Sequence, residues 1–305
     1  MGLQKLATNS FFKSFFDFWK LIRYKNILII SSTQCFSYYF LSPNIGLENL
    51  FSSRFILLLC STFLSAAAGY IINDYMDVKL DMVNKPQSVI IGKTISRRWA
   101  ILLHSGFNVF AFVLAWQISY RVAILVFVCS LLLWMYSQYF KKSYLLGNLL
   151  VAIMTASTIF ILIPFDEKAN ILGCLAYSIF AFFSNLIREI IKDTEDIKGD
   201  SKFNANTLPI KLGIKHTKQI LFYLQLCFIL MCLSFTILFP AISNVGPLAS
   251  FQFITYISLL VIIPSIYLLF KLWNADTKKH FTHLSFIAKI IMLLGIFSMV
   301  FWKTY

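Results

Sequence analysis

The chain has 305 residues, of which 59% are hydrophobic and only 13% are charged. A soluble domain carries roughly 25% charged residues, so this composition excludes an ordinary soluble enzyme. The formal net charge of +14 at pH 7 comes from basic residues in short segments between apolar runs. That distribution favours anionic lipid headgroups and anionic substrates as partners, and it disfavours nucleic acid.

The first 25 residues are expected to form an interfacial segment. Lys5, Lys13 and Lys20 interrupt the apolar residues, and no small-residue cleavage site of a signal peptide follows them. The stretch 11–21 is rich in Phe and Trp with scattered charges. It predicts an amphipathic helix that lies in the membrane interface.

Nine apolar runs follow, each long enough to cross a hydrocarbon core about 30 Å thick. They cover residues 26–43, 55–73, 99–117, 120–137, 145–164, 170–188, 217–239, 250–271 and 284–302. We therefore predict an all-α, polytopic membrane protein with about nine transmembrane helices around a central cavity and with cytoplasmic cap loops or helices. The whole chain, 1–305, is expected to form one domain.

Lysine and arginine are divided unevenly between the two sides that nine spans define. The side of the N-terminus carries 22 basic residues in its segments, and the opposite side carries four. The positive-inside rule places the basic side in the cytoplasm. We expect a protein of the cell inner membrane with a cytoplasmic N-terminus.

Acidic residues gather in two short clusters on the predicted cytoplasmic side, which together hold eight of the 13 in the chain. Both clusters begin with an asparagine and continue with acids at intervals of four. The first, at the end of the second span, contains Asn73, Asp77 and Asp81; the second, at the end of the sixth, contains Asn185, Glu189 and Asp193, then Asp196 and Asp200.

This spacing predicts two acidic helix faces. Residues four apart lie on one face of a helix, and like charges at that spacing destabilise it unless a cation lies between them. Hard cations such as Mg²⁺ prefer carboxylate oxygens and usually share their ligand shell with substrate phosphates. Solvated loop acids would explain one cluster, but two matching clusters next to a membrane favour a functional site.

A calcium-binding loop is a weaker interpretation of the second cluster. Counted from Asp193, the fifth position is Ile197, which offers no side-chain oxygen, and the glycine Gly199 comes one place late. The twelfth position is Asn204, where a calcium loop has Glu.

The two clusters resemble the acidic motifs of the UbiA superfamily of intramembrane prenyltransferases. The sequence NDYMDVKLD, residues 73–81, is similar to the motif NDxxDxxxD, and KDTEDIKGD, residues 192–200, is similar to the second motif, DxxDxxxD. Three further segments resemble family features: 23–26 resembles the RxxN entry, 136–148 the Tyr/Lys loop after span four, and 206–213 the segment that closes the second acidic loop.

The resemblance implies a Mg²⁺-dependent transfer of a prenyl group from a prenyl diphosphate to a lipophilic acceptor, without an obligate protein partner. It implies metal ligation by Asn73, Asp77, Asp81, Asp193, Asp196 and Asp200, with Asp77, Asp81, Asp196 and Asp200 as the catalytic candidates. Candidates for binding the diphosphate are Lys85, Lys141 and Lys142. Candidates for binding the acceptor are Arg23, Asn26, Tyr136 and Tyr139.

One feature departs from the family pattern. Many members follow the first motif with two Arg-Pro pairs, whereas this chain has Lys85-Pro86 and then Ser88-Val89. Lysine keeps the positive charge but lacks the bidentate fork of arginine.

The acceptor is less constrained than the reaction. The form NDYxD followed by Asn84-Lys85-Pro86 resembles the branch that acts on geranylgeranylglyceryl phosphate. Aromatic acceptors of quinone biosynthesis, 4-hydroxybenzoate or 1,4-dihydroxy-2-naphthoate, stay open. An ion-coupled secondary transporter is disfavoured because such transporters usually place their acids near the bilayer midplane, and a CDP-alcohol phosphotransferase because its order of acidic residues is not found.

Overall fold

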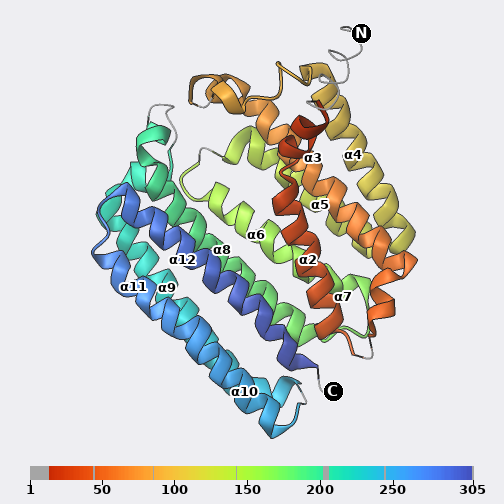
Figure 1. Ribbon diagram of the computed structural model, residues 1–305, viewed down its shortest axis with the longest axis vertical. Helices are drawn as coiled ribbons and strands as arrows, with labels where there is room; N and C mark the ends of the chain where they lie inside the picture. Colours follow the sequence, from red (N-terminus) through yellow and green to blue (C-terminus); the bar gives the residue numbers. More distant parts are fainter. Residues whose placement is uncertain are drawn as a thin grey trace, which may run out of the picture. The chain divides into compact units, whose positions relative to one another are not determined.

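The computed structural model describes residues 14–43, 45–84, 86–141, 143–201, 206–243 and 245–303, without the side chains of residues 80, 83, 84, 88, 198 and 199. Every named element in these residues is a helix (Figure 1), which confirms the all-α prediction. The chain divides into two compact units, one formed by residues 1–32 and 51–139 and the other by 33–50 and 140–305. The single domain 1–305 stays a prediction.

The first unit contains a helix over residues 14–21, the first part of α2 (Tyr24–Leu41), α3 (Ser53–Asn84), η2 (Pro86–Ser88), α4 (Arg97–Ile118) and α5 (Tyr120–Met135). The helix α3 packs against both α4 and α5. Small residues make these contacts close: a Cβ added at Gly69 would lie 2.8 Å from Cδ1 of Leu133 on α5. Small residues that let helix backbones approach are typical of membrane helix interfaces.

The helix of residues 14–21 belongs to the core of this unit. Leu21 and the following Ile22 are fully buried and share a hydrophobic cluster with Ile71 of α3. The hydroxyl of Thr94 donates a hydrogen bond to Asp17 at 2.6 Å. The predicted N-terminal helix is therefore present over these residues, whereas residues 1–13 lie outside the described part.

The second unit contains the rest of α2, η1 (Leu47–Phe51), α6 (Leu146–Phe160), α7 (Leu162–Phe165), α8 (Ile171–Asp200), α9 (Leu208–Ser243), α10 (Pro247–Ile257), η5 (Ser258–Ile262), α11 (Ile263–Trp273), α12 (Lys278–Phe297) and η6 (Ser298–Trp302). The helix α8 is central, since it packs against α6, α9 and α12 (Figure 1). A Cβ at Gly295 of α12 would come within 1.9 Å of Cζ of Phe180 on α8, so these two helices touch closely at a glycine.

Eight helical segments among the described residues are long and apolar enough to cross a membrane. They are Ser53–Lys79, Arg97–Ile118, Tyr120–Phe140, Leu146–Phe165, Ile171–Ile197, Leu208–Ser243, Pro247–Trp273 and Lys278–Trp302. They correspond to the predicted second to ninth spans. The predicted first span, 26–43, forms the helix α2, but the polar run Ser31–Gln34 lowers its apolarity, so the count of nine is not confirmed.

The helix α9 is interrupted near its start. Gly213 has φ 78° and ψ 163°, a backbone conformation that a residue with a Cβ adopts only with strain. The turn before it, which follows the second acidic motif, is thereby separated from the long membrane-spanning part of α9.

Candidate active site

The first acidic motif lies on one uninterrupted helix. The helix α3 continues through the motif to Asn84, so Asn73, Asp77 and Asp81 share a helix face, as their spacing predicts. Asn73 and Asp77 are buried, with 9% and 8% of their surface exposed, and Asp81 is half-buried. Their carboxylate and amide oxygens are of the donor type that Mg²⁺ prefers.

Arg23 lies beside this motif. Its Nη2 pairs with Oδ1 of Asp74 at 3.0 Å, and its guanidinium stands 5.0 Å from the ring centroid of Tyr70 on the same face of α3. Its φ of 52° lies in the left-handed region, where a non-glycine residue carries backbone strain that other contacts must offset. Asn26 is exposed, and its backbone N–H donates to the carbonyl of Arg23 at 2.8 Å. The predicted acceptor-binding role of both residues stays a prediction.

The basic segment that follows α3 makes contacts within the first unit. The ammonium of Lys93 donates to the carbonyl of Pro86, and the guanidinium of Arg97 lies 4.4 Å from the ring centroid of Tyr75. The second contact holds the cationic guanidinium of Arg97 beside a residue of the first motif. Lys85, the predicted diphosphate ligand in this segment, lies outside the described residues.

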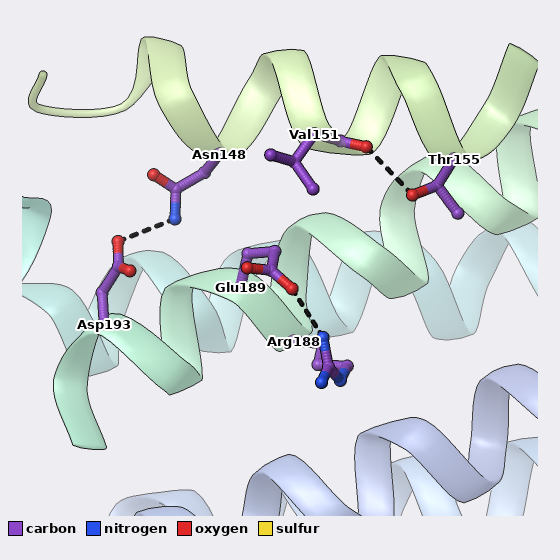
Figure 2. Close-up of polar contacts among 6 residues, drawn as sticks. All are labelled: Asn148, Val151, Thr155, Arg188, Glu189 and Asp193. Atoms are coloured by element: carbon purple, nitrogen blue, oxygen red, sulfur yellow. Dashed lines mark hydrogen bonds and ion pairs between the residues drawn. The ribbon is translucent and has the colours of Figure 1, made fainter. Parts of the chain in front are cut away.

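The second acidic motif also lies on one helix, since α8 continues to Asp200. Side chains of two neighbouring helices hold its acids. Nδ2 of Asn148 on α6 donates to Oδ2 of Asp193 at 2.8 Å (Figure 2). From α12, the hydroxyl of Thr282 donates to Oε1 of Glu195 at 2.9 Å, and Nζ of Lys278 lies 3.7 Å from Oδ1 of Asp196.

Asp200 ends the second motif in a partly desolvated position. Burial raises the pKa of its carboxyl, the negative charge of Asp196 raises this pKa further, and the positive charges of Lys141 and Lys192 lower it. Burial and a neighbouring negative charge disfavour the ionised form of this carboxyl, and a nearby cation would stabilise that form. Lys141, a predicted diphosphate ligand, is thus near the second motif, whereas Lys142 lies outside the described residues.

A further polar group lies one to two turns before Asp193 on α8. Nη1 of Arg188 pairs with Oε1 of Glu189 at 2.5 Å (Figure 2). Asn185 is buried, with 5% of its surface exposed, and its side-chain nitrogen has no hydrogen-bond partner. The polar face of α8 therefore extends from the motif toward the apolar part of the helix.

The predicted acceptor residues Tyr136 and Tyr139 lie in the π-helical turn η3 (Tyr136–Phe140). Tyr136 is half-buried. Tyr139 is 61% exposed, and its ring meets that of Trp134 edge-on at a centroid distance of 6.0 Å. Their role in acceptor binding stays a prediction.

The donor atoms of the two motifs fit Mg²⁺, because they are carboxylate and amide oxygens. Within the described part of the chain, no group of three or more His, Cys, Asp or Glu side chains is arranged to hold a metal ion by itself. An incomplete set of protein oxygens is compatible with Mg²⁺, which usually keeps several waters and binds substrate phosphates. Ligation by the six predicted residues stays a prediction.

Sequence reasoning missed several residues that contact the acidic motifs. They are Lys278 and Thr282 of α12, and Asn148 of α6 was noted only as part of a family resemblance. Asn148 is 45 positions from Asp193, and Thr282 is 87 positions from Glu195. No local sequence pattern indicates such contacts.

Comparison with known proteins adds independent information. A sequence model described as the UbiA prenyltransferase family matches residues 35–290. A digeranylgeranylglyceryl phosphate synthase of Korarchaeum cryptofilum is 30% identical over 253 residues, which cover 83% of this chain and 86% of that protein. A protein of the same name from Thermococcus sibiricus is 33% identical over 165 residues, covering 54% of this chain, so the chain spans 58% of that relative's length.

Solved structures show the same fold. A structure described as a digeranylgeranylglyceryl phosphate synthase in membranes aligns with a TM-score of 0.73 at 22% identity, covering 94% of this chain and 99% of that chain. A UbiA homologue from Archaeoglobus fulgidus bound to GPP and Mg²⁺ aligns with a TM-score of 0.60 at 17% identity, covering 93% and 99%. The family match covers most of the chain and confirms the family predicted from the two acidic motifs: this integral membrane protein belongs to the UbiA prenyltransferase family.

Proposed function

We propose that this chain transfers a prenyl group from a prenyl diphosphate to geranylgeranylglyceryl phosphate, with Mg²⁺ as the cofactor. The observation that carries this proposal is the relative from Korarchaeum cryptofilum, which is named a digeranylgeranylglyceryl phosphate synthase and matches 83% of the chain. The separate match to the family model covers residues 35–290 and so includes both acidic motifs.

The metal would be held by oxygens from two helices, namely Asn73, Asp77 and Asp81 of α3 and Asp193, Asp196 and Asp200 of α8. When bound, Mg²⁺ neutralises the diphosphate and stabilises the negative charge that develops on the leaving group. Support comes from the donor chemistry of these residues and from the related Archaeoglobus fulgidus protein, whose structure holds GPP and Mg²⁺.

The cationic residues near the motifs would bind the diphosphate directly. Lys141 is our described candidate, because its positive charge lowers the pKa of Asp200 in the second motif. During transfer, the bond between C1 of the prenyl group and the diphosphate oxygen breaks, and pyrophosphate leaves with the bonding electrons. The acceptor hydroxyl oxygen forms the new bond to C1 and releases its proton.

We place the acid-bearing helix ends on the cytoplasmic side of the cell inner membrane. This orientation is supported by the uneven distribution of Lys and Arg along the sequence. Water-soluble diphosphate products would then be released into the cytoplasm.

The test uses purified protein in lipid nanodiscs with Mg²⁺ and geranylgeranyl diphosphate, and it measures pyrophosphate release. We expect release with geranylgeranylglyceryl phosphate and none with 4-hydroxybenzoate or 1,4-dihydroxy-2-naphthoate. Asp77→Ala and Asp196→Ala should each abolish release while circular dichroism shows an intact helical fold. Unchanged turnover in either variant would contradict the metal assignment, and release with an aromatic acceptor alone would contradict the acceptor assignment.

A further inference from the structure

Asn148 makes a buried contact with the second acidic motif. It lies in the first turn of α6, only 7% of its surface is exposed, and its Nδ2 donates to Oδ2 of Asp193 at 2.8 Å (Figure 2). Both the distance and the donor type are those of a good hydrogen bond to a carboxylate. We infer that Asn148 is a positioning residue that orients the carboxylate of Asp193 toward a divalent cation.

This inference rests on the proposed function, because the orientation of Asp193 has a catalytic consequence only if Asp193 binds the metal. A hydrogen bond to one carboxylate oxygen restricts rotation of the group and leaves the other oxygen, Oδ1, to face a ligand. Residues that hydrogen-bond metal ligands fix ligand orientation, and their mutation typically lowers metal affinity about 10–100-fold.

The chemical type of the donor also matters. The side-chain amide of Asn148 is neutral, so it holds Asp193 without cancelling its negative charge. A lysine or arginine at this place would neutralise the carboxylate and compete with the metal for it. Asn148 therefore fixes the geometry of Asp193 without adding a positive charge beside it.

The other bonds drawn in Figure 2 each join residues of one helix. The hydroxyl of Thr155 donates to the carbonyl of Val151 on α6 at 2.9 Å, and Glu189 pairs with its neighbour Arg188 on α8 at 2.5 Å. Among the bonds drawn there, the one from Asn148 to Asp193 alone joins α6 to α8. This bond couples the start of α6 to the acidic motif.

The start of α6 is itself held in place. The hydroxyl of Ser143 donates to the carbonyl of Phe140 at 2.6 Å and accepts from the backbone N–H of Gly147 at 3.2 Å. These bonds fix the turn that precedes Asn148, and the same turn contains Lys141. The position of Asn148 is thus determined by the loop as well as by packing on α8.

The experiment compares Asn148→Ala and Asn148→Leu with Thr155→Val. Leucine has the same branching as asparagine and a larger volume but cannot donate a hydrogen bond, so an effect that it shares with the smaller alanine is not a simple loss of packing. Thr155→Val is the matched control, because it removes a polar group from the same helix without touching the motif. Mn²⁺ binding is measured by electron paramagnetic resonance in the presence of inorganic pyrophosphate, and the Mg²⁺ activation constant is measured by turnover.

We expect both Asn148 variants to bind Mn²⁺ at least about tenfold more weakly and to need correspondingly more Mg²⁺, with a much smaller change of kcat at saturating Mg²⁺. Thr155→Val should match the wild type in both measurements. In an Asp193→Asn background, Asn148→Ala should cause no additional loss, because it acts through Asp193.

Two results would overturn the inference: Mn²⁺ binding by both Asn148 variants equal to that of Thr155→Val, or an undiminished effect of Asn148→Ala in the Asp193→Asn background. The single variant Asp193→Asn separates this failure from a failure of the proposed function. If Asp193→Asn keeps wild-type metal binding and turnover, the metal role of Asp193 is wrong. If it loses both while the Asn148 variants lose neither, only the positioning role is wrong.

Discussion

The two acid-bearing helix ends share their spacing but are supported differently. On α3, Arg23 of the N-terminal segment pairs with Asp74, and Arg97 of α4 lies over the ring of Tyr75. On α8, the partners come from two other helices of the same unit, Asn148 of α6 and the start of α12 at Lys278. The first motif is therefore contacted by the N-terminal segment and by α4, and the second by α6 and α12.

The prediction with the largest expected effect asks whether the acid-bearing ends of α3 and α8 contribute equally to turnover. Asp81→Asn and Asp200→Asn each remove one negative charge from the end of a motif. If both helices bind the metal, each variant should lower kcat at least about 100-fold, which corresponds to roughly 2.7 kcal/mol of transition-state stabilisation. Steady-state turnover over a range of Mg²⁺ concentrations measures it. A large loss in one variant with wild-type turnover in the other would show that one motif works alone.

The next effect tests the dependence of the α8 end on helix packing. A Cβ at Gly295 would lie 1.9 Å from the Phe180 ring, so Gly295→Ala forces α12 away from α8 and should lower stability by about 1–3 kcal/mol. Gly106→Ala in α4 is the control, because nothing lies within 4 Å of its added Cβ, and alanine should raise helix stability there by about 0.5–1 kcal/mol. Thermal unfolding in detergent measures both, and equal melting temperatures would contradict the close contact.

A smaller effect is expected for the coupling free energy of the Arg23–Asp74 ion pair. The two side chains are 45% and 26% exposed, so solvent screening limits their coupling to about 0.5 kcal/mol. A double-mutant cycle with Arg23→Ala and Asp74→Asn, followed by thermal unfolding, measures that coupling. If Arg23 instead binds the acceptor, Arg23→Ala will raise the acceptor KM and Asp74→Asn will leave it unchanged.

The smallest effect concerns pH at the α8 end. Burial and Asp196 raise the pKa of Asp200, whereas Lys141 and Lys192 lower it. Since the folded pKa lies above the unfolded one, the folded protein binds this proton more tightly, and metal-free stability falls as pH rises from the ordinary Asp pKa to the raised value. Metal binding needs the ionised form, so Lys141→Gln should shift the acid limb of Mg²⁺-dependent turnover to higher pH. Lys279→Gln is the control, and an identical profile for the two variants would contradict the contact.

Much of the fold follows from local sequence properties. The predicted span 55–73 lies inside α3, and 170–188 lies inside α8 except for its first residue. Both helices continue through the acidic motifs, as acids spaced by four residues indicate. The prediction was least successful at the first span, because the polar run Ser31–Gln34 makes α2 less apolar than a typical membrane helix. Helix formation and membrane crossing are separate properties. The segment forms a helix, but it is not among the helices apolar enough to count as a membrane span.

The sequence by itself determined the all-helical membrane architecture, the family and the helix faces that carry the acids, because each of these depends on composition or on residues within a few turns of one another. Only the tertiary structure decided which side chains hold those acids. Asn148 reaches Asp193, and Thr282 reaches Glu195, because α6 and α12 pack on α8. Contacts between helices far apart in the chain depend on which faces pack together, and no single segment encodes that choice.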